Sequence, residues 1–241
     1  MKNIVLINGS PKPHDEDCAS KFIVDTAGSH LDDAYAKTFI NVRKSILNHR
    51  TDEDFETLSK ADAVIIAFPL YIFCMPGILI RFLQDYHKFL IEHKREQNVN
   101  VKVYTVVNCG FPESDINLEA VNSIRSFCNH VNADFRFGVL IGGGGMLLRA
   151  GNAPFMKKVM NSLQDAFAAM AADIRVHDST SGDSTSNDSI SGDNKKIENI
   201  SISMNFPRRL YFFMGDRGWN SEARKYGLNK RDLFRKPYLN V

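Results

Sequence analysis

The sequence predicts an α/β domain built on a parallel β-sheet, and two patterns support this prediction. Short, continuous apolar runs, such as Asn3–Ile7 and Ala63–Ala67, are typical of strands that are covered on both faces. These runs alternate along the chain with stretches of helical character, and this alternation favours parallel strands joined by right-handed crossovers. A chain of 241 residues is long enough for one such domain with an appendage.

Strands and helices are expected in turn. The strands are predicted at Asn3–Ile7, Tyr35–Phe39, Ala63–Ala67, Val101–Val107 and Phe135–Ile141, which makes a five-stranded sheet. The helices are predicted at Cys18–His30, Asp52–Lys60, Pro76 to about His93, Ile116–Asn132 and Ala153–Ala172. Pro76 suits the first turn of its helix, because no N–H group is needed there for a helical hydrogen bond.

The predicted core domain covers residues 1–175, and the composition changes after it. Residues 176–199 are dominated by Ser, Thr, Asp, Gly and Asn, so they cannot bury enough apolar area to offset their ordering entropy. We expect this segment to be a flexible linker. Residues 200–241 are expected to form a C-terminal helical extension that is rich in aromatic side chains. Its apolar residues either return to their own core or pack on a second subunit.

The charge pattern narrows the classes of partner. A formal net charge of +2 gives no general attraction for polyanions. Basic residues are concentrated between Arg208 and Lys236. We interpret this segment as a solvated helical face or a dimer contact, or alternatively as a site for an anionic cofactor or partner. No recognised nucleic-acid reader motif accompanies them, so no nucleic-acid partner is expected.

The apolar segments and the cysteines indicate a cytoplasmic protein. The apolar run after Lys2 is too short for a signal peptide, and the later run Phe68–Leu83 is interrupted by prolines, Gly77 and Arg81. Membrane binding is therefore not expected. The four cysteines contain no C-x-x-C pair, which favours free thiols in a reducing compartment over a zinc site or a dithiol motif.

The first candidate loop, at Gly9–Ser20, follows the first predicted strand. The Ser10 hydroxyl, Lys12 and the N–H groups of Cys18–Ser20 could surround a phosphate group, because a helix begins there. The segment Asp15–Asp17 opposes this interpretation, since three acids close to a phosphate would repel it unless they turn outward. An ordinary Gly-Ser-Pro turn is the alternative.

The second candidate loop, Phe68–Gly77, is apolar at a strand end, where polar residues are normally favoured. Such a surface predicts a flat apolar ligand, with the N–H groups of Tyr71–Phe73 meeting a polar ring edge. The alternative is that Phe68 and Ile72 simply fill the core.

The third candidate loop, Asn108–Glu113, follows the fourth predicted strand. Gly110 permits close backbone approach or a positive φ, and Asn108 and Glu113 offer polar contacts to a ligand edge. The run Gly142–Gly145 after the last strand is either a hinge or a place where backbone approaches a ligand. It lacks the spacing of a dinucleotide fingerprint or a P-loop.

The sequence shows no hydrolytic triad and no metal-ligand cluster, so no catalytic side chain and no metal ligand is assigned. A redox cofactor explains this shortage of acid–base groups, because a flavin carries its own electron chemistry.

The segments Ile7–Lys12, Phe68–Gly77 and Asn108–Phe111 resemble the flavodoxin-like NAD(P)H-dependent oxidoreductases, often labelled NADPH-dependent FMN reductases. They occur in the family's order over residues 1 to about 172. The C-terminal segment around Pro207–Trp219 also looks like an extension found in one bacterial branch of that family.

The resemblance implies a flavodoxin-like three-layer sandwich with strand order 2-1-3-4-5, and FMN at the carboxyl edge of the sheet. It also implies NADH or NADPH as electron donor, a small-molecule acceptor (a quinone, nitro compound, metal or free flavin) and a homodimer. The implied phosphate-binding residues are Ser10, Lys12, Cys18, Ala19 and Ser20. The residues implied to flank the isoalloxazine are Pro69, Leu70, Tyr71, Ile72 and Phe73, with Asn108, Gly110 and Phe111 on its other side. The chain departs from the family in its acidic first loop, where relatives tend to place Asn, Ser or Thr.

The leading hypothesis is therefore an FMN-dependent NAD(P)H oxidoreductase. A flavodoxin-like electron carrier is the first alternative, although flavodoxins usually bring an acidic docking surface and a Thr-rich phosphate loop. The second alternative is an interaction protein that kept the fold and lost the cofactor, for which the acidic segment Asp15–Asp17 is the main argument.

Overall fold

The structure is a computed structural model that describes residues 1–14, 16, 18–93, 101–176, 198–204 and 207–236. The chain divides into two compact units, Met1–Met204 and Asn205–Val241. No helix among the described residues is both long enough and apolar enough to span a membrane.

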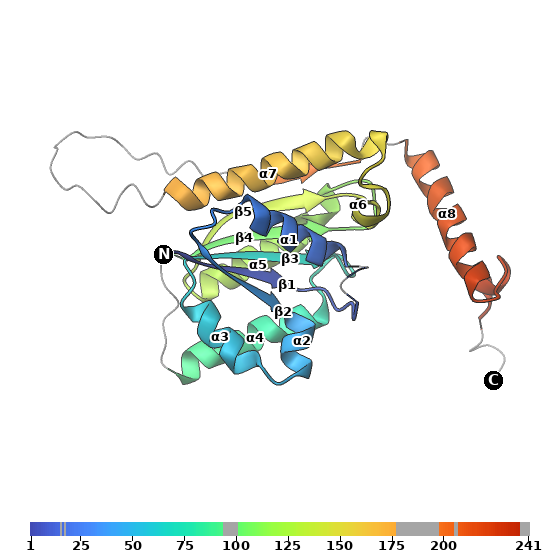
Figure 1. Cartoon of the computed structure of the whole chain (residues 1–241). Coiled ribbons are helices and arrows are strands. Elements are labelled where there is room, and N and C mark those ends of the chain that lie inside the picture. Colours follow the sequence, from blue (N-terminus) through green and yellow to red (C-terminus); the bar gives the residue numbers. More distant parts are fainter. Residues whose placement is uncertain (15, 17, 94–100, 177–197, 205–206, 237–241) are drawn as a thin grey trace. The chain divides into compact units, whose positions relative to one another are not determined.

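The first unit is built on a parallel sheet in the order β2-β1-β3-β4-β5-β6 (Figure 1). Its strands are β1 Asn3–Asn8, β2 Ala36–Asn41, β3 Ala63–Pro69, β4 Lys102–Asn108, β5 Asp134–Ile141 and β6 Ile200–Ile202. The central strands β3 and β4 are almost wholly buried, as their continuous apolar runs predict. The predicted order of the first five strands is confirmed.

The prediction of five strands was wrong in its count, because β6 extends the sheet. Ile202 pairs with Ile141 of β5, and the Asn199 side chain accepts a hydrogen bond from the Gly138 amide at 2.8 Å. Ile202 and Met204 are buried, so this part of the expected helical extension returns to its own core. A strand of three residues is shorter than the pattern by which strands are recognised. The predicted linker lies mostly outside the described residues.

Helices cover both faces of the sheet. The helices are α1 Ala19–His30, α2 Val42–Leu47, α3 Thr51–Ser59, α4 Gly77–Glu92, α5 Leu118–His130, α6 Gly145–Ala150 and α7 Lys157–Val176. Short 3₁₀ turns, Asp115–Asn117 and Pro154–Met156, precede α5 and α7. Helices α1, α6 and α7 lie on one face, and α2, α3, α4 and α5 lie on the other (Figure 1). This is the predicted three-layer arrangement.

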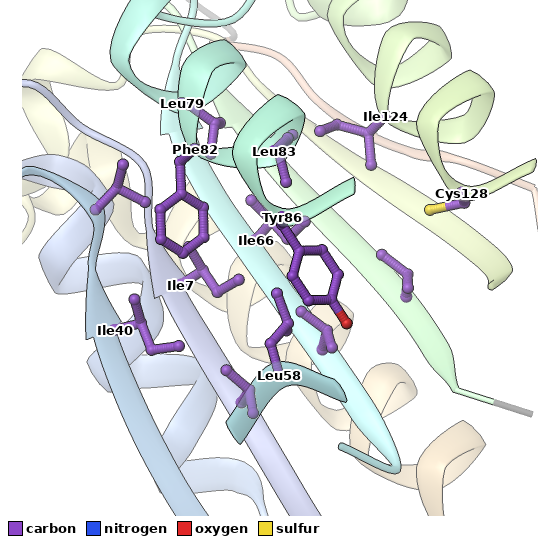
Figure 2. Packing of buried hydrophobic residues seen from close by; sticks show 14 of the residues in the cluster. Ile7, Ile40, Leu58, Ile66, Leu79, Phe82, Leu83, Tyr86, Ile124 and Cys128 are labelled. Atoms are coloured by element: carbon purple, nitrogen blue, oxygen red, sulfur yellow. The ribbon is translucent and has the colours of Figure 1, made fainter. Parts of the chain in front are cut away.

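The core on the α4 face depends on the spacing of apolar residues along that helix. Leu79, Phe82, Leu83 and Tyr86 recur at helical intervals and point toward the sheet, where they meet residues such as Ile66 (Figure 2). In α3, Phe55 packs against Phe82 and Tyr86 with ring centroids 5.0 and 5.4 Å apart. Each of these buried side chains contributes about 1.5–3 kcal/mol relative to exposure, so this face anchors the loops that leave the sheet.

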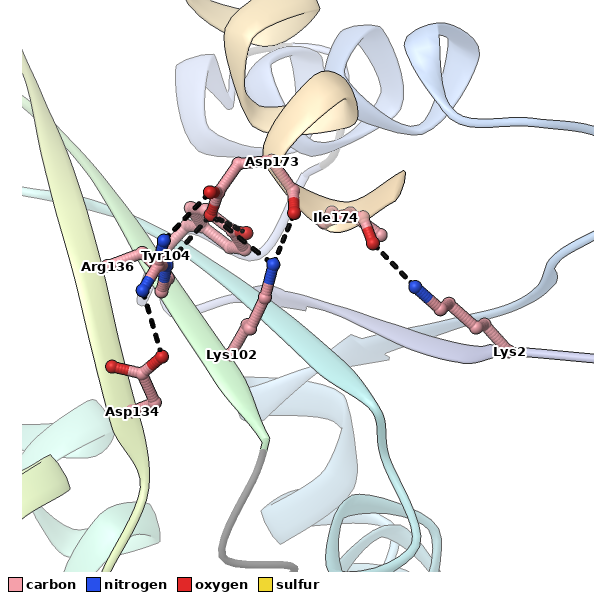
Figure 3. A network of polar contacts seen from close by, with 7 residues as sticks. All are labelled: Lys2, Lys102, Tyr104, Asp134, Arg136, Asp173 and Ile174. Carbon is pink, nitrogen blue, oxygen red and sulfur yellow. Dashed lines mark hydrogen bonds and ion pairs between the residues drawn. The ribbon is translucent and has the colours of Figure 1, made fainter. Parts of the chain in front are cut away.

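A polar network ties α7 to the amino ends of the strands (Figure 3). Asp173 accepts two hydrogen bonds of 2.8 Å from the Arg136 guanidinium and one of 2.6 Å from the Tyr104 hydroxyl. The ammonium groups of Lys102 and Lys2 donate to the carbonyls of Asp173 and Ile174, which closes the last turn of the helix.

The network also sets the ionisation of its acid. Burial by itself raises the pKa of Asp173, but hydrogen bonds from Arg136 and Tyr104 and the nearby charge of Lys102 outweigh that effect. The pKa of Asp173 therefore lies below its usual value.

The second unit consists of α8 Arg208–Lys225 and the 3₁₀ turn Asp232–Phe234. Among residues 207–236, Ala223 is the only buried residue, while Trp219 is 70% exposed and Phe234 is 74% exposed. Arginines lie over two of its aromatic rings, Arg208 over Phe212 and Arg217 over Phe213, each 5.4 Å from the ring centroid.

Asp173→Asn should lower the free energy of unfolding by about 3 kcal/mol at pH 7, because Arg136 loses its buried counter-charge. Since the folded-state pKa of Asp173 lies below the unfolded one, its stabilisation is present above the unfolded pKa and disappears as pH falls through the folded pKa. Urea unfolding measured from pH 7 to pH 3 should therefore show that the free energy of unfolding falls more steeply with decreasing pH in the wild type than in the variant. Asp165→Asn, at an exposed position of the same helix, is the control. If the free energy of unfolding depended on pH equally in all three proteins, the lowered pKa of Asp173 would be contradicted.

Candidate functional site

The candidate loops leave adjacent strands at one edge of the sheet. The first follows β1, the second follows β3 and the third follows β4, and these strands are neighbours. Pro69 lies opposite Asn108, so β3 and β4 end level, and the last residue of β1, Asn8, lies opposite Ala67 near the end of β3. The chain order reverses at β1, which has β2 on one side and β3 on the other. Such a switch point is where open α/β sheets bind ligands.

The first loop is a tight turn that is held against β3. The Gly9 amide donates to the Ala67 carbonyl at 2.8 Å, and a Cβ atom at Gly9 would lie only 2.8 Å from a Leu79 methyl group. The Ser10 hydroxyl oxygen accepts a hydrogen bond from the Lys12 amide at 3.3 Å, and Ser10 is buried. The hydroxyl proton of Ser10 remains able to donate, and the Lys12 side chain is exposed.

Helix α1 begins immediately after this loop, and Cys18 is its N-cap. The Cys18 sulfur accepts a hydrogen bond from the Lys21 amide at 3.4 Å and lies 3.6 Å from the Asn8 side-chain nitrogen. Cys18 is 1% exposed, so its side chain serves the helix start. The first turn of α1 carries no acidic residue. Its leading N–H groups and the helix dipole therefore favour an anion at this point.

The second loop contains a strained hairpin turn at its tip. Tyr71 and Cys74 exchange two backbone hydrogen bonds of 2.9 and 3.0 Å, and the two residues between them are left-handed, with φ of 51° at Ile72 and 58° at Phe73. A turn with two positive φ angles normally uses Asn and Gly. A β-branched residue in that conformation is an outlier, and strain of this kind is concentrated at functional sites.

The same turn exposes apolar side chains and backbone donors together. Ile72 is 95% exposed and Phe73 is 63% exposed. The amides of these two residues donate no hydrogen bond to any described part of the chain. The turn therefore presents two fixed N–H groups beside apolar surface, which suits a flat ligand with a polar edge. The alternative that Ile72 fills the core is wrong. Phe68, in contrast, is fully buried.

Asn108 joins the three loops through its amide group. Its side-chain nitrogen donates to the Phe68 carbonyl at 3.1 Å and to the Ser20 hydroxyl at 3.3 Å. Its own backbone carbonyl accepts from the Leu70 amide at 2.8 Å. Asn108 is 5% exposed, so the structure gives its side chain a positioning role within the chain.

The third loop is open on one side and tightly packed on the other. Phe111 is 45% exposed, and a Cβ atom at Gly110 would meet nothing within 4 Å. Gly110 has no positive φ, so of its two expected roles only a close approach to a ligand stays a prediction. Cys109 is buried below the loop, and burial raises the pKa of its thiol, which keeps it neutral and unreactive.

The glycine run after β5 packs against this third loop. A Cβ atom at Gly142 would lie 2.1 Å from the Pro112 carbonyl oxygen, and one at Gly144 would lie 2.6 Å from the Asn108 side-chain oxygen. Gly143 has φ of +67° and donates to the Phe111 carbonyl at 2.6 Å. The sequence interpretation, a hinge or an approach to a ligand, missed this contact because the partners are distant in sequence.

The structure thus brings most predicted site residues to one edge, with unequal access. The exposed ones are Lys12, Tyr71, Ile72, Phe73, Gly110 and Phe111; Ala19, Pro69 and Leu70 are half-buried; Ser10, Cys18, Ser20 and Asn108 are buried. Their roles toward a ligand stay predictions. Of the acidic segment, Glu16 is exposed, and Asp15 and Asp17 lie outside the described residues. The described His, Cys, Asp and Glu side chains form no group that could hold a metal ion.

No protein-family model and no curated protein matches the chain. Solved structures do match it. The apo form of an NADH:FMN oxidoreductase has a TM-score of 0.53 at 16% identity, covering 72% of this chain and 90% of that one. An oxidoreductase from Corynebacterium diphtheriae has a TM-score of 0.55 at 14% identity, covering 73% and 98%. General stress protein 14 from Treponema denticola, in complex with FMN, has a TM-score of 0.52 at 15% identity, covering 73% and 100%. At this identity the likeness confirms the flavodoxin-like fold.

Replacing the strained turn by its preferred residues should stabilise the protein. The double substitution Ile72→Asn with Phe73→Gly should raise the free energy of unfolding by about 2 kcal/mol, because both residues tolerate positive φ. Urea unfolding measures the change. The matched control, Ile72→Ala with Phe73→Ala, removes the same exposed apolar groups but keeps the strain. A control as stable as the Asn-Gly variant would show that the backbone is not the cause.

Proposed function

We propose that the protein is an FMN-dependent NAD(P)H oxidoreductase of the flavodoxin-like reductase family, which transfers electrons to a small acceptor. The observation that carries this proposal is the strained Tyr71–Cys74 turn at the switch point of the sheet. It presents apolar side chains together with two amides that donate to no residue the structure describes. Neighbours of the same fold, an NADH:FMN oxidoreductase and an FMN complex of a stress protein, support the choice of cofactor.

The phosphate of FMN would be held where β1 meets α1. The N–H groups of Ala19 and Ser20 at the start of α1 and the Ser10 hydroxyl can donate hydrogen bonds to it. The exposed ammonium group of Lys12 adds positive charge at the mouth of the loop. Cys18 and Ser20 contribute here through their backbone, because their side chains are buried in contacts with Asn8 and Asn108.

The ring would lie against the second and third loops. The amides of Ile72 and Phe73 can donate to its polar edge, while the side chains of these residues and of Phe111 cover its apolar area and exclude water. Bound FMN supplies the acceptor for a hydride from the nicotinamide, and the protein supplies position and electrostatics. This division fits a site in which no acid–base side chain was assigned.

The phosphate assignment predicts discrimination between two flavins. FMN should bind at least tenfold more tightly than riboflavin, which lacks the phosphate, and Lys12→Ala should weaken FMN binding by roughly tenfold without changing riboflavin binding. Quenching of flavin fluorescence gives both dissociation constants. Lys60→Ala removes an exposed lysine at the C-cap of α3 and is the control.

Equal loss of affinity for both flavins in Lys12→Ala would contradict the phosphate assignment. A colourless wild-type protein that binds neither flavin at micromolar concentration would overturn the proposed function and favour the cofactor-less interaction protein. If FMN binds but NADH and NADPH fail to bleach it rapidly under anaerobic conditions, the electron carrier is favoured instead.

We also propose that the protein is a cytoplasmic homodimer. The second unit supports a dimer, because a segment as short as Asn205–Val241 cannot bury a core of its own and described aromatic side chains such as Trp219 are exposed. Four free cysteines suit a reducing compartment.

Sedimentation at tens of micromolar should show a dimer, and Trp219→Asp should shift it toward monomer. A wild-type monomer at that concentration would contradict the dimer.

A further inference from the structure

We propose that strand β6 and the two residues after it are a buttress for the third loop, and that Ser203 is a positioning residue for the site. The buttress is defined as Ile200–Met204, and the loop it supports is Cys109–Asp115. The inference rests on the proposed function, because the loop carries Phe111 to the edge where FMN would bind.

Backbone hydrogen bonds fix the buttress to the middle of the loop and to the glycine run. The Met204 amide donates to the Pro112 carbonyl at 3.0 Å, and the Ile202 carbonyl accepts from the Gly142 amide at 2.9 Å. The next two amides of the glycine run, those of Gly143 and Gly144, donate to the carbonyls of Phe111 and Cys109. The loop is thus enclosed between the glycine run and the buttress.

Side chains of the buttress complete the attachment. The Ser203 hydroxyl lies 2.8 Å from the Ser114 hydroxyl and accepts a hydrogen bond from the Ser114 amide at 3.2 Å. Ser114 is fully buried, so the loss of this partner leaves a buried amide without an acceptor. Met204 is buried and packs against Gly143. A Cβ atom added at Gly143 would lie 2.5 Å from the terminal methyl carbon of Met204.

These contacts make the loop depend on a distant part of the chain. Within the described ranges, Ser203 is linked to the loop and not to the first or second candidate loop. Residues 200–204 were expected in the C-terminal extension, so neither the loop motif nor the resemblance points to them. Movement of the buttress would displace Phe111 while the phosphate end of the site stays in place.

The test compares Ser203→Ala with Ser203→Thr, which keeps the hydroxyl and places its methyl group at an exposed position. Ser29→Ala, an exposed hydroxyl bonded within α1, is the control. Hydrogen exchange of the amides in residues 109–115 should accelerate about tenfold in Ser203→Ala and return toward wild type in Ser203→Thr. The dissociation constant of FMN, from fluorescence quenching, should rise roughly fivefold in Ser203→Ala alone. The global unfolding midpoint in urea identifies any variant that is generally destabilised.

Unchanged exchange in Ser203→Ala would overturn the proposal, and so would faster exchange with unchanged FMN affinity. If Ser203→Thr behaves like Ser203→Ala, the hydroxyl is not the positioning group and the assignment of Ser203 fails. A wild-type protein that binds no FMN would refute the proposed function, and the exchange measurement would then decide the buttress by itself.

Discussion

The geometry of the candidate site depends on one buried amide, that of Asn108. Its side chain and its backbone carbonyl together connect the end of β3, the start of α1 and the second loop. Leaving a buried polar group of this kind without a hydrogen bond costs about 1–3 kcal/mol. Each partner of Asn108 is therefore held within hydrogen-bonding distance of it. The hydrogen bonds of Asn108 therefore join the ends of β3 and β4 and the start of α1 into one fixed edge, on which the strained turn can be maintained.

The two edges of the sheet are specialised in different ways. At the amino ends, Asp173 joins Arg136, Tyr104 and Lys102 in contacts that are satisfied within the chain. At the carboxyl ends, the turn at Ile72 and Phe73 leaves donors and apolar surface without partners in the described chain. The satisfied polar network and the proposed ligand site thus lie at opposite ends of the same strands, and the carboxyl ends are where open α/β sheets bind their ligands. Strain at one edge is tolerated because the core and the opposite edge are well satisfied.

The sequence predicted the central architecture because its signals are local. Strands such as Ala63–Pro69 are continuous apolar runs, and the start of α4 is marked by Pro76. What the sequence could not predict depends on partners that are distant in the chain. Neither the contact of Gly142 with Pro112 nor the pairing of β6 with β5 has a local pattern. The turn at Ile72 was also hidden, since its residues are atypical for positive φ. The three candidate loops do follow adjacent strands, as predicted, and their role toward a ligand stays a prediction. The positioning contacts of Asn108 and Cys18 needed the structure.

The place of β6 in the chain has a consequence for how the protein matures. Strands β1 to β5 occur within the first 141 residues, and β6 follows only at residue 200. Domains fold from the N-terminus as they are synthesised, and a long connection must close before a distant strand can pair. The five central strands can therefore assemble on the ribosome before β6 exists. On the proposed role of the buttress, the third loop would reach its final position only after β6 has been made and has paired with β5, when most of the core is already formed.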